Sequence, residues 1–110
     1  VKDKVCLMFD DIIDTAGTIT EAAKLLKSQG AKSIYVGAAH AVFSGPAMER
    51  IENAPIEECI VTNTIPWKKE DLPKNVRQLS VAPLLGQAIS RIHDDESISS
   101  LFGFEKEMKV

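Results

Sequence analysis

The chain has 110 residues, of which 45% are hydrophobic and 26% are charged, and its formal net charge is −3 at pH 7. This length and hydrophobic content predict one small globular domain with a modest core and exclude a disordered tail. Lys and Arg are scattered along the chain, which argues against nucleic acid or a membrane surface as a partner. No signal peptide is visible, and no uncharged stretch reaches the roughly 18 residues that a membrane-spanning helix needs.

The two cysteines, Cys6 and Cys59, lie inside the hydrophobic runs VCLMF and ECIVT. Thiols in such runs indicate reduced side chains buried in strands rather than a disulfide. We therefore expect a reducing setting and a cytoplasmic protein.

The first predicted strand is a continuous apolar run at residues 5–9, which is typical of a strand covered on both faces in a parallel sheet. Apolar residues spaced as on one helix face then run from Ile19 to Leu26. Thr18 and Glu21 have the spacing of a capping box at the start of this helix, and Gly30 would end it.

The pattern of strand and helix repeats along the rest of the chain. Further strands are predicted at 33–40, 59–62 and 76–79. The motif Ser44-Gly45-Pro46 would open a short helix, and Ser80 would cap a longer amphipathic helix that we expect to pack on the sheet. Ile98, Leu101 and Phe102 suggest a last extended piece. Strands that alternate with helices predict an α/β domain with a largely parallel sheet flanked by helices.

Ligands of such sheets bind beyond the carboxyl ends of the strands, and several polar residues lie there in this sequence. They are Asp10, Asp11, His40, Thr62 and Asn63. His40 at a strand end has a simpler interpretation, which we favour: a hydrogen bond to a neighbouring carbonyl group.

The stretch FDDIIDTAGTI, residues 9–19, is the strongest candidate for a site. Thr15, Gly17 and Thr18 near a helix N-terminus offer hydroxyl and backbone donors that suit a phosphate. Asp10 and Asp11 offer acceptors for a vicinal diol or ligands for Mg²⁺. A sugar phosphate would satisfy both halves of this motif.

Capping alone is a competing explanation of the same stretch, since loops from strand to helix are commonly rich in Asp, Thr and Gly. The adjacent pair Asp10 and Asp11 favours a site, because capping does not require two carboxylates there.

The segment DDIIDTAGTI closely resembles the phosphoribosyl pyrophosphate-binding motif of type I phosphoribosyltransferase-like proteins. The segments AHAVFSGPAMERI, VTNTIP, VAPLLGQAISRIH and ESISSLF then follow in the order and spacing of the ribose-phosphate pyrophosphokinase family. This resemblance covers essentially the whole chain, and ordinary phosphoribosyltransferases share only the first segment.

The resemblance implies an enzyme that transfers the diphosphate of ATP to ribose 5-phosphate, with Mg²⁺, in nucleotide biosynthesis. It also implies phosphate and ADP as effectors and a homo-oligomeric assembly. By position, the 5-phosphate would be held by Asp14, Thr15, Ala16, Gly17 and Thr18, and the ribose hydroxyls by Asp10 and Asp11. Ser97 and Ser99 match a segment of the family's regulatory site.

Members of that family have two α/β domains, and this chain resembles the latter part of the second. We expect residues 1–104 to form the folded core and residues 105–110 to form a tail. The Mg²⁺ ligands and the catalytic Lys and Arg would lie mostly upstream of Val1, so no catalytic residue is assigned and we expect the chain alone to be inactive. Two alternatives are a non-catalytic associated subunit of the same fold and a nucleotide-salvage phosphoribosyltransferase.

Overall fold

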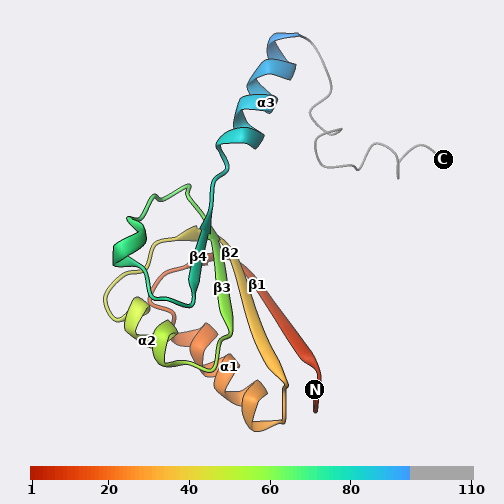
Figure 1. Cartoon of the computed structure of the whole chain (residues 1–110), viewed down its shortest axis with the longest axis vertical. Helices are drawn as coiled ribbons and strands as arrows, with labels where there is room; N and C mark the ends of the chain where they lie inside the picture. Colours follow the sequence, from red (N-terminus) through yellow and green to blue (C-terminus); the bar gives the residue numbers. More distant parts are fainter. Residues whose placement is uncertain (95–110) are drawn as a thin grey trace, which may run out of the picture. The chain divides into compact units, whose positions relative to one another are not determined.

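The computed structural model describes residues 1–94 of the chain and divides it into two units, residues 1–79 and 80–110. The first unit contains a parallel sheet of four strands in the order β1-β2-β3-β4 (Figure 1). The strands are β1 (Val5–Ile13), β2 (Ser33–Ala41), β3 (Glu58–Thr62) and β4 (Val76–Leu79). The predicted parallel α/β fold is confirmed.

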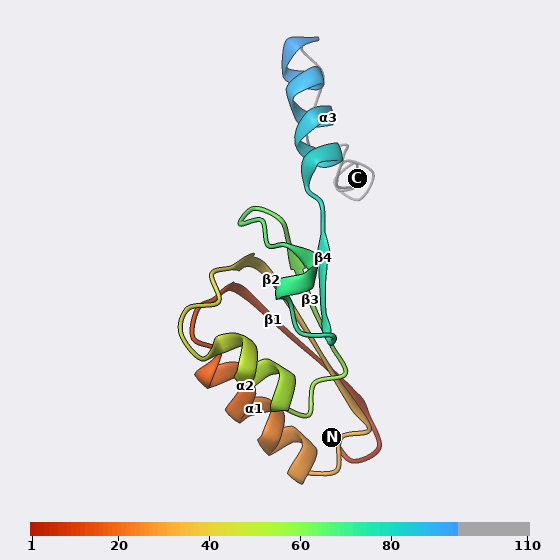
Figure 2. The same ribbon diagram turned by 60° about the vertical axis from the view of Figure 1, so that its left-hand side comes forward.

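Two helices, α1 (Gly17–Ser28) and α2 (Ala47–Asn53), cover one face of this sheet (Figure 2). The core lies between them and the two central strands. Val36 of β2, Cys59 of β3 and Ile51 of α2 are almost fully buried there. Burial of such side chains removes apolar area from water, at about 25 cal/mol per Å².

The register brings the polar residues that were predicted at the strand ends to the same edge of the sheet. Asp10 of β1 is opposite Ala38 of β2, and Val61 of β3 is opposite the same Ala38. Strand β1 continues to Ile13, four residues beyond the predicted end at Phe9, so Asp10 and Asp11 belong to the strand itself.

Within residues 1–79, helices cover only one face of β1, and the predicted covering of its other face stays a prediction. Val5, Leu7 and Phe9 alternate along the strand and are 54%, 62% and 80% exposed. Both α1 and α2 lie on the other face of the sheet (Figure 2). Within this unit, the apolar run of β1 therefore has one buried face and one open apolar face.

The connection from β3 to β4 contains the short 3-10 helix η1 (Lys69–Asp71). Trp67 anchors this connection, because its indole Nε1 donates to the carbonyl oxygen of Ala41 at 2.7 Å and its ring lies 6.0 Å from that of Phe43. The connection is thus attached to the core at Trp67.

The second unit contains helix α3 (Ala82–His93). The predicted helix is confirmed, with Pro83 in its first turn. The N-cap position is taken by Val81 rather than by the predicted Ser80, whose Oγ accepts from the N–H of Ala82 at 3.1 Å. The packing of this helix on the sheet would be a contact between the two units, and it stays a prediction. Ile98, Leu101, Phe102 and the tail 105–110 lie outside the described residues.

Candidate functional site

The loop from β1 to α1 closes around a hollow of about 200 Å³. Six of the seven predicted ligand-binding residues line it, and Asp11 does not. These six are Asp10, Asp14, Thr15, Ala16, Gly17 and Thr18. The structure therefore brings one end of β1 and the first turn of α1 together around a single space.

Backbone N–H groups at the start of α1 are the donors that this hollow offers. The first helical hydrogen bond runs from the N–H of Thr20 to the carbonyl oxygen of Ala16 at 3.1 Å. The N–H groups of residues 16–19 consequently have no carbonyl partner within the helix, and no side chain caps them. Four such donors and the positive end of the helix dipole suit an oxyanion.

The predicted capping box of Thr18 and Glu21 is wrong. Helix α1 begins at Gly17, with Ala16 at the N-cap position, so Thr18 already lies inside the first turn. The hydroxyl that serves this turn belongs to the buried Thr20, whose Oγ1 donates to the carbonyl oxygen of Ala16 at 2.6 Å. The N-terminal N–H groups thus stay available, because no side chain competes for them.

Ala16 supplies the unusual backbone conformation of the loop. Its φ is 64° and its ψ is 12°, in the left-handed region that favours glycine, whereas Gly17 has no positive φ. A non-glycine residue in this region costs roughly 1–3 kcal/mol and persists where the surrounding structure enforces it. A left-handed residue followed by helical residues turns successive N–H groups toward one concavity, which is an arrangement that binds anions.

A side chain that the sequence reasoning did not identify contacts this loop. Arg50 of α2 donates from Nη1 to the carbonyl oxygen of Thr15 at 3.1 Å. A Cβ atom on Gly17 would lie 3.2 Å from the same Nη1. Gly17 therefore makes room for the guanidinium group. The contact joins residues 35 positions apart, so no local sequence pattern could reveal it.

The carboxylates of Asp10 and Asp11 lie near the end of β1, and only Asp10 lines the loop hollow. Oδ1 of Asp10 accepts from the N–H of Asp11 at 2.8 Å, and Oδ1 of Asp11 accepts from the N–H of Ile12 at 2.9 Å. The pKa of Asp11 lies below its usual value, first through the interaction with the Asp10 side chain and then through backbone N–H groups, with a smaller contribution from His40. Asp11 is therefore an acceptor at neutral pH.

His40 forms a side-chain hydrogen bond, but to a hydroxyl group rather than to the expected carbonyl. Its Nδ1 lies 2.7 Å from Oγ1 of Thr64, which also lies 3.2 Å from the carbonyl oxygen of Ala39. Thr62 donates to the same carbonyl oxygen at 2.5 Å. This cluster ties β2 to the turn after β3 and supports the structural interpretation of His40.

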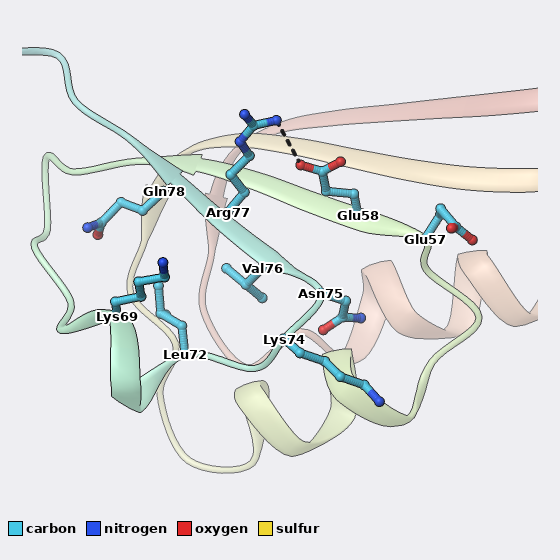
Figure 3. Close-up of a pocket in the computed structure, with 9 residues that line it drawn as sticks. All are labelled: Glu57, Glu58, Lys69, Leu72, Lys74, Asn75, Val76, Arg77 and Gln78. Carbon is cyan, nitrogen blue, oxygen red and sulfur yellow. Dashed lines mark hydrogen bonds and ion pairs between the residues drawn. The ribbon is translucent and has the colours of Figure 1, made fainter.

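A second hollow, of about 550 Å³, lies beside β3, β4 and η1 and contains none of the predicted site residues (Figure 3). Nη1 of Arg77 pairs with Oε1 of Glu58 at 3.4 Å there. Asn75 donates from Nδ2 to the carbonyl oxygens of Ile51 and Ile56, at 3.0 and 3.3 Å. These contacts hold the end of α2 and the approach to β3 in place, which is a structural role.

No cluster of three or more His, Cys, Asp or Glu residues that could hold a metal ion occurs within residues 1–94. Asp10 and Asp11 alone give too few oxygen ligands for a complete Mg²⁺ site, which needs six. In the same range, no helix is long and apolar enough to cross a membrane. Ser97 and Ser99, the predicted regulatory residues, lie outside the described part.

Fold and site together define a parallel α/β protein with an oxyanion-type loop at the carboxyl edge of its sheet. The model of the phosphoribosyl synthetase-associated domain matches residues 1–103, so the chain belongs to this family. The resemblance to ribose-phosphate pyrophosphokinases is thereby confirmed.

Curated relatives and a solved structure agree with this assignment. The chain is 56% identical over 102 residues to the ribose-phosphate pyrophosphokinase of Listeria ivanovii and 54% identical to that of Clostridium perfringens. Each match covers 93% of this chain and 32% of the relative. The crystal structure of phosphoribosylpyrophosphate synthetase from Mycobacterium smegmatis aligns with a TM-score of 0.82 and 41% identity, over 86% of this chain and 32% of that one. The chain thus spans about a third of the length of these proteins.

Proposed function

We propose that this chain is the ribose 5-phosphate-binding part of an enzyme that transfers the diphosphate of ATP to ribose 5-phosphate. The product, phosphoribosyl pyrophosphate, would serve nucleotide biosynthesis. The observation that carries the proposal is the loop hollow, which six of the seven predicted residues line in a member of this family.

The two parts of the sugar phosphate correspond to the two parts of the loop. The 5-phosphate accepts from the N–H groups at the start of α1 and from the hydroxyls of Thr15 and Thr18. The carboxylates of Asp10 and Asp11 accept from the ribose hydroxyls. The loop therefore binds and orients the acceptor of the diphosphate, which is the part of phosphoryl-type transfer that depends on positioning.

The remaining partners belong to the same proposal. Asp10 or Asp11 would contribute at most part of the ligand set of a Mg²⁺ ion, which would supply charge neutralisation at the ATP phosphates. ATP, and phosphate or ADP as effectors through Ser97 and Ser99, bind in a homo-oligomeric assembly in the cytoplasm. The names of the relatives support the reaction class, and the loop supports the acceptor half of it.

The associated-subunit alternative predicts sugar phosphate binding without catalysis in the parent protein, and the salvage alternative predicts tighter binding of phosphoribosyl pyrophosphate than of ribose 5-phosphate. The intact segment DTAGT ranks the associated subunit below the diphosphokinase. The similarity to ribose-phosphate pyrophosphokinases over 93% of the chain ranks the salvage enzyme below it.

Calorimetry with ribose 5-phosphate tests the proposal on the full chain. The double variant Asp10→Ala/Asp11→Ala should lose at least about tenfold in affinity, because each charged acceptor contributes about 1.5–3 kcal/mol when its donor is ordered. The matched control is Glu70→Ala/Asp71→Ala, which removes an adjacent exposed carboxylate pair in η1, away from the hollow.

The control should retain the affinity of the unmodified chain. Equal affinities of all three proteins would remove the diol-binding role of Asp10 and Asp11. No binding by the unmodified, folded chain would contradict the proposed site itself.

A further inference from the structure

Arg50 is the cation in direct contact with the loop backbone within the described residues, and it does not line the loop hollow. It reaches the loop from α2, on the side where a hollow of about 500 Å³ separates α1 from α2. Its guanidinium group donates from Nη1 to the carbonyl oxygen of Thr15 at 3.1 Å. It therefore acts on the loop from behind, through a peptide group.

Arg50 contacts the peptide group between Thr15 and Ala16, and the N–H of this group is one of the backbone donors of the loop. The carbonyl of Thr15 and the N–H of Ala16 belong to the same planar unit. A charged donor at that carbonyl polarises the unit and strengthens its N–H as a donor. It also fixes the orientation of the peptide beside Ala16, the residue with the left-handed conformation.

Arg50 brings a positive charge to a loop that acidic side chains border. Asp10 and Asp14 line the hollow, and a phosphate would add further negative charge. Lys24, a cation of the neighbouring hollow, is paired with Glu21 at 3.3 Å. The cationic guanidinium of Arg50 binds through a planar fork, so it offsets this charge without entering the site.

We propose that Arg50 is a positioning residue for the phosphate loop, holding the Thr15–Ala16 peptide in its anion-binding orientation across the space that Gly17 leaves open. The choice of ribose 5-phosphate as the ligand rests on the proposed function. The effect of Arg50 on the loop rests on the geometry alone.

Three variants separate the parts of this contact. Arg50→Met removes the charge and the donors at similar length, whereas Arg50→Lys keeps the charge and loses the fork. Gly17→Ala displaces the guanidinium from the other side, since its Cβ would lie 3.2 Å from Nη1. The matched control is Lys24→Met, which removes a cation from the neighbouring hollow without touching the loop backbone.

Calorimetry with ribose 5-phosphate should show an affinity loss of about 10- to 100-fold in Arg50→Met, as expected for a lost charge-assisted bond. Arg50→Lys should recover part of this loss, and Lys24→Met should stay within about twofold of the unmodified chain. The effects of Gly17→Ala and Arg50→Met should not add in the double variant, because both break the same contact.

Amide hydrogen exchange by nuclear magnetic resonance, without ligand, provides the second measurement. Arg50→Met should shift the amide signals of residues 16–18 and raise exchange at Thr20, whose N–H closes the first turn onto Ala16, while amides of β2 and β3 keep their protection. Unchanged signals at residues 16–18 together with unchanged exchange at Thr20 would overturn the inference, whether or not ribose 5-phosphate binds. Absence of binding to the unmodified chain, with the exchange effect present, would contradict only the proposed function.

Discussion

Cys59 shows at the scale of one residue how burial sets chemistry. Its side chain is fully buried in β3, and desolvation raises the pKa of its thiol to about 11. Because the thiolate is the reactive form, Cys59 is inert near neutral pH. Cys6 in β1 is only partly buried. Both thiols are free, in agreement with the prediction from their hydrophobic surroundings.

Labelling with iodoacetamide at pH 8 should therefore modify Cys6 while Cys59 stays protected. In urea-unfolded chain Cys59 should react at least about a hundred times faster, because its thiol then returns to an ordinary pKa near 8.5. Since the folded pKa is the higher one, stability from this group is complete below the unfolded pKa and decreases as the pH rises toward about 11. Mass spectrometry of peptides checks the rates, and equal labelling of both cysteines in native chain would contradict the burial of Cys59.

The residues of the loop could be located from the sequence, but their individual roles could not. Asp10 and residues 14–18 surround one hollow, as the motif indicated. The left-handed backbone is at Ala16, although glycine is the residue that sequence reasoning associates with it. Arg50 was missed because its contact depends on how α2 packs beside α1, which only the folded chain defines.

Strands β1 and β2 contact each other closely at Gly37, which is opposite Phe9. The ring of Phe9 lies over this residue, and a Cβ on Gly37 would meet Cδ1 and Cε1 of Phe9 at 3.0 Å. Phe9 is 80% exposed, so its ring can move into open space. Gly17 is different, since the atom it meets is engaged with the loop backbone.

Gly37→Ala should consequently leave the protein as stable as before, or raise its free energy of unfolding by about 0.5 kcal/mol, because glycine weakens strand interiors. The ring signals of Phe9 should shift as the ring turns away. Urea unfolding followed by the fluorescence of Trp67, the single tryptophan, measures the stability. A loss of more than about 1 kcal/mol would show that the Phe9 ring is held in place.

The order and type of the elements could be predicted because apolar spacing differs between strands and helices. Their ends were less predictable. Strand β1 runs on through Asp10 and Asp11 because its ladder with β2 continues to Ile13, whatever the polarity of the side chains. The capping box failed because helix α1 begins at Gly17 with Ala16 at the N-cap position, which leaves Thr18 inside the first turn.

At the scale of the whole molecule, the charges around the loop hollow fit the acceptor half of the proposed enzyme. Carboxylates and backbone donors line the loop hollow, and no Lys or Arg side chain lines it within residues 1–94. Transfer of a diphosphoryl group needs cations placed at the phosphates where charge develops. The relatives are about three times as long as this chain, which covers 32% of them.

The isolated chain should therefore bind ribose 5-phosphate and form no phosphoribosyl pyrophosphate from it with ATP and Mg²⁺. The physical reason is that positioning the acceptor alone leaves the negative charge of the ATP phosphates uncompensated during transfer. Purified chain, incubated with both substrates, is assayed for the product and for AMP release, with the Listeria ivanovii ribose-phosphate pyrophosphokinase as the active reference. Product above the protein-free blank that disappears in Asp10→Ala/Asp11→Ala would show that this chain contains a complete catalytic apparatus, which contradicts the assignment of transfer to the rest of the enzyme.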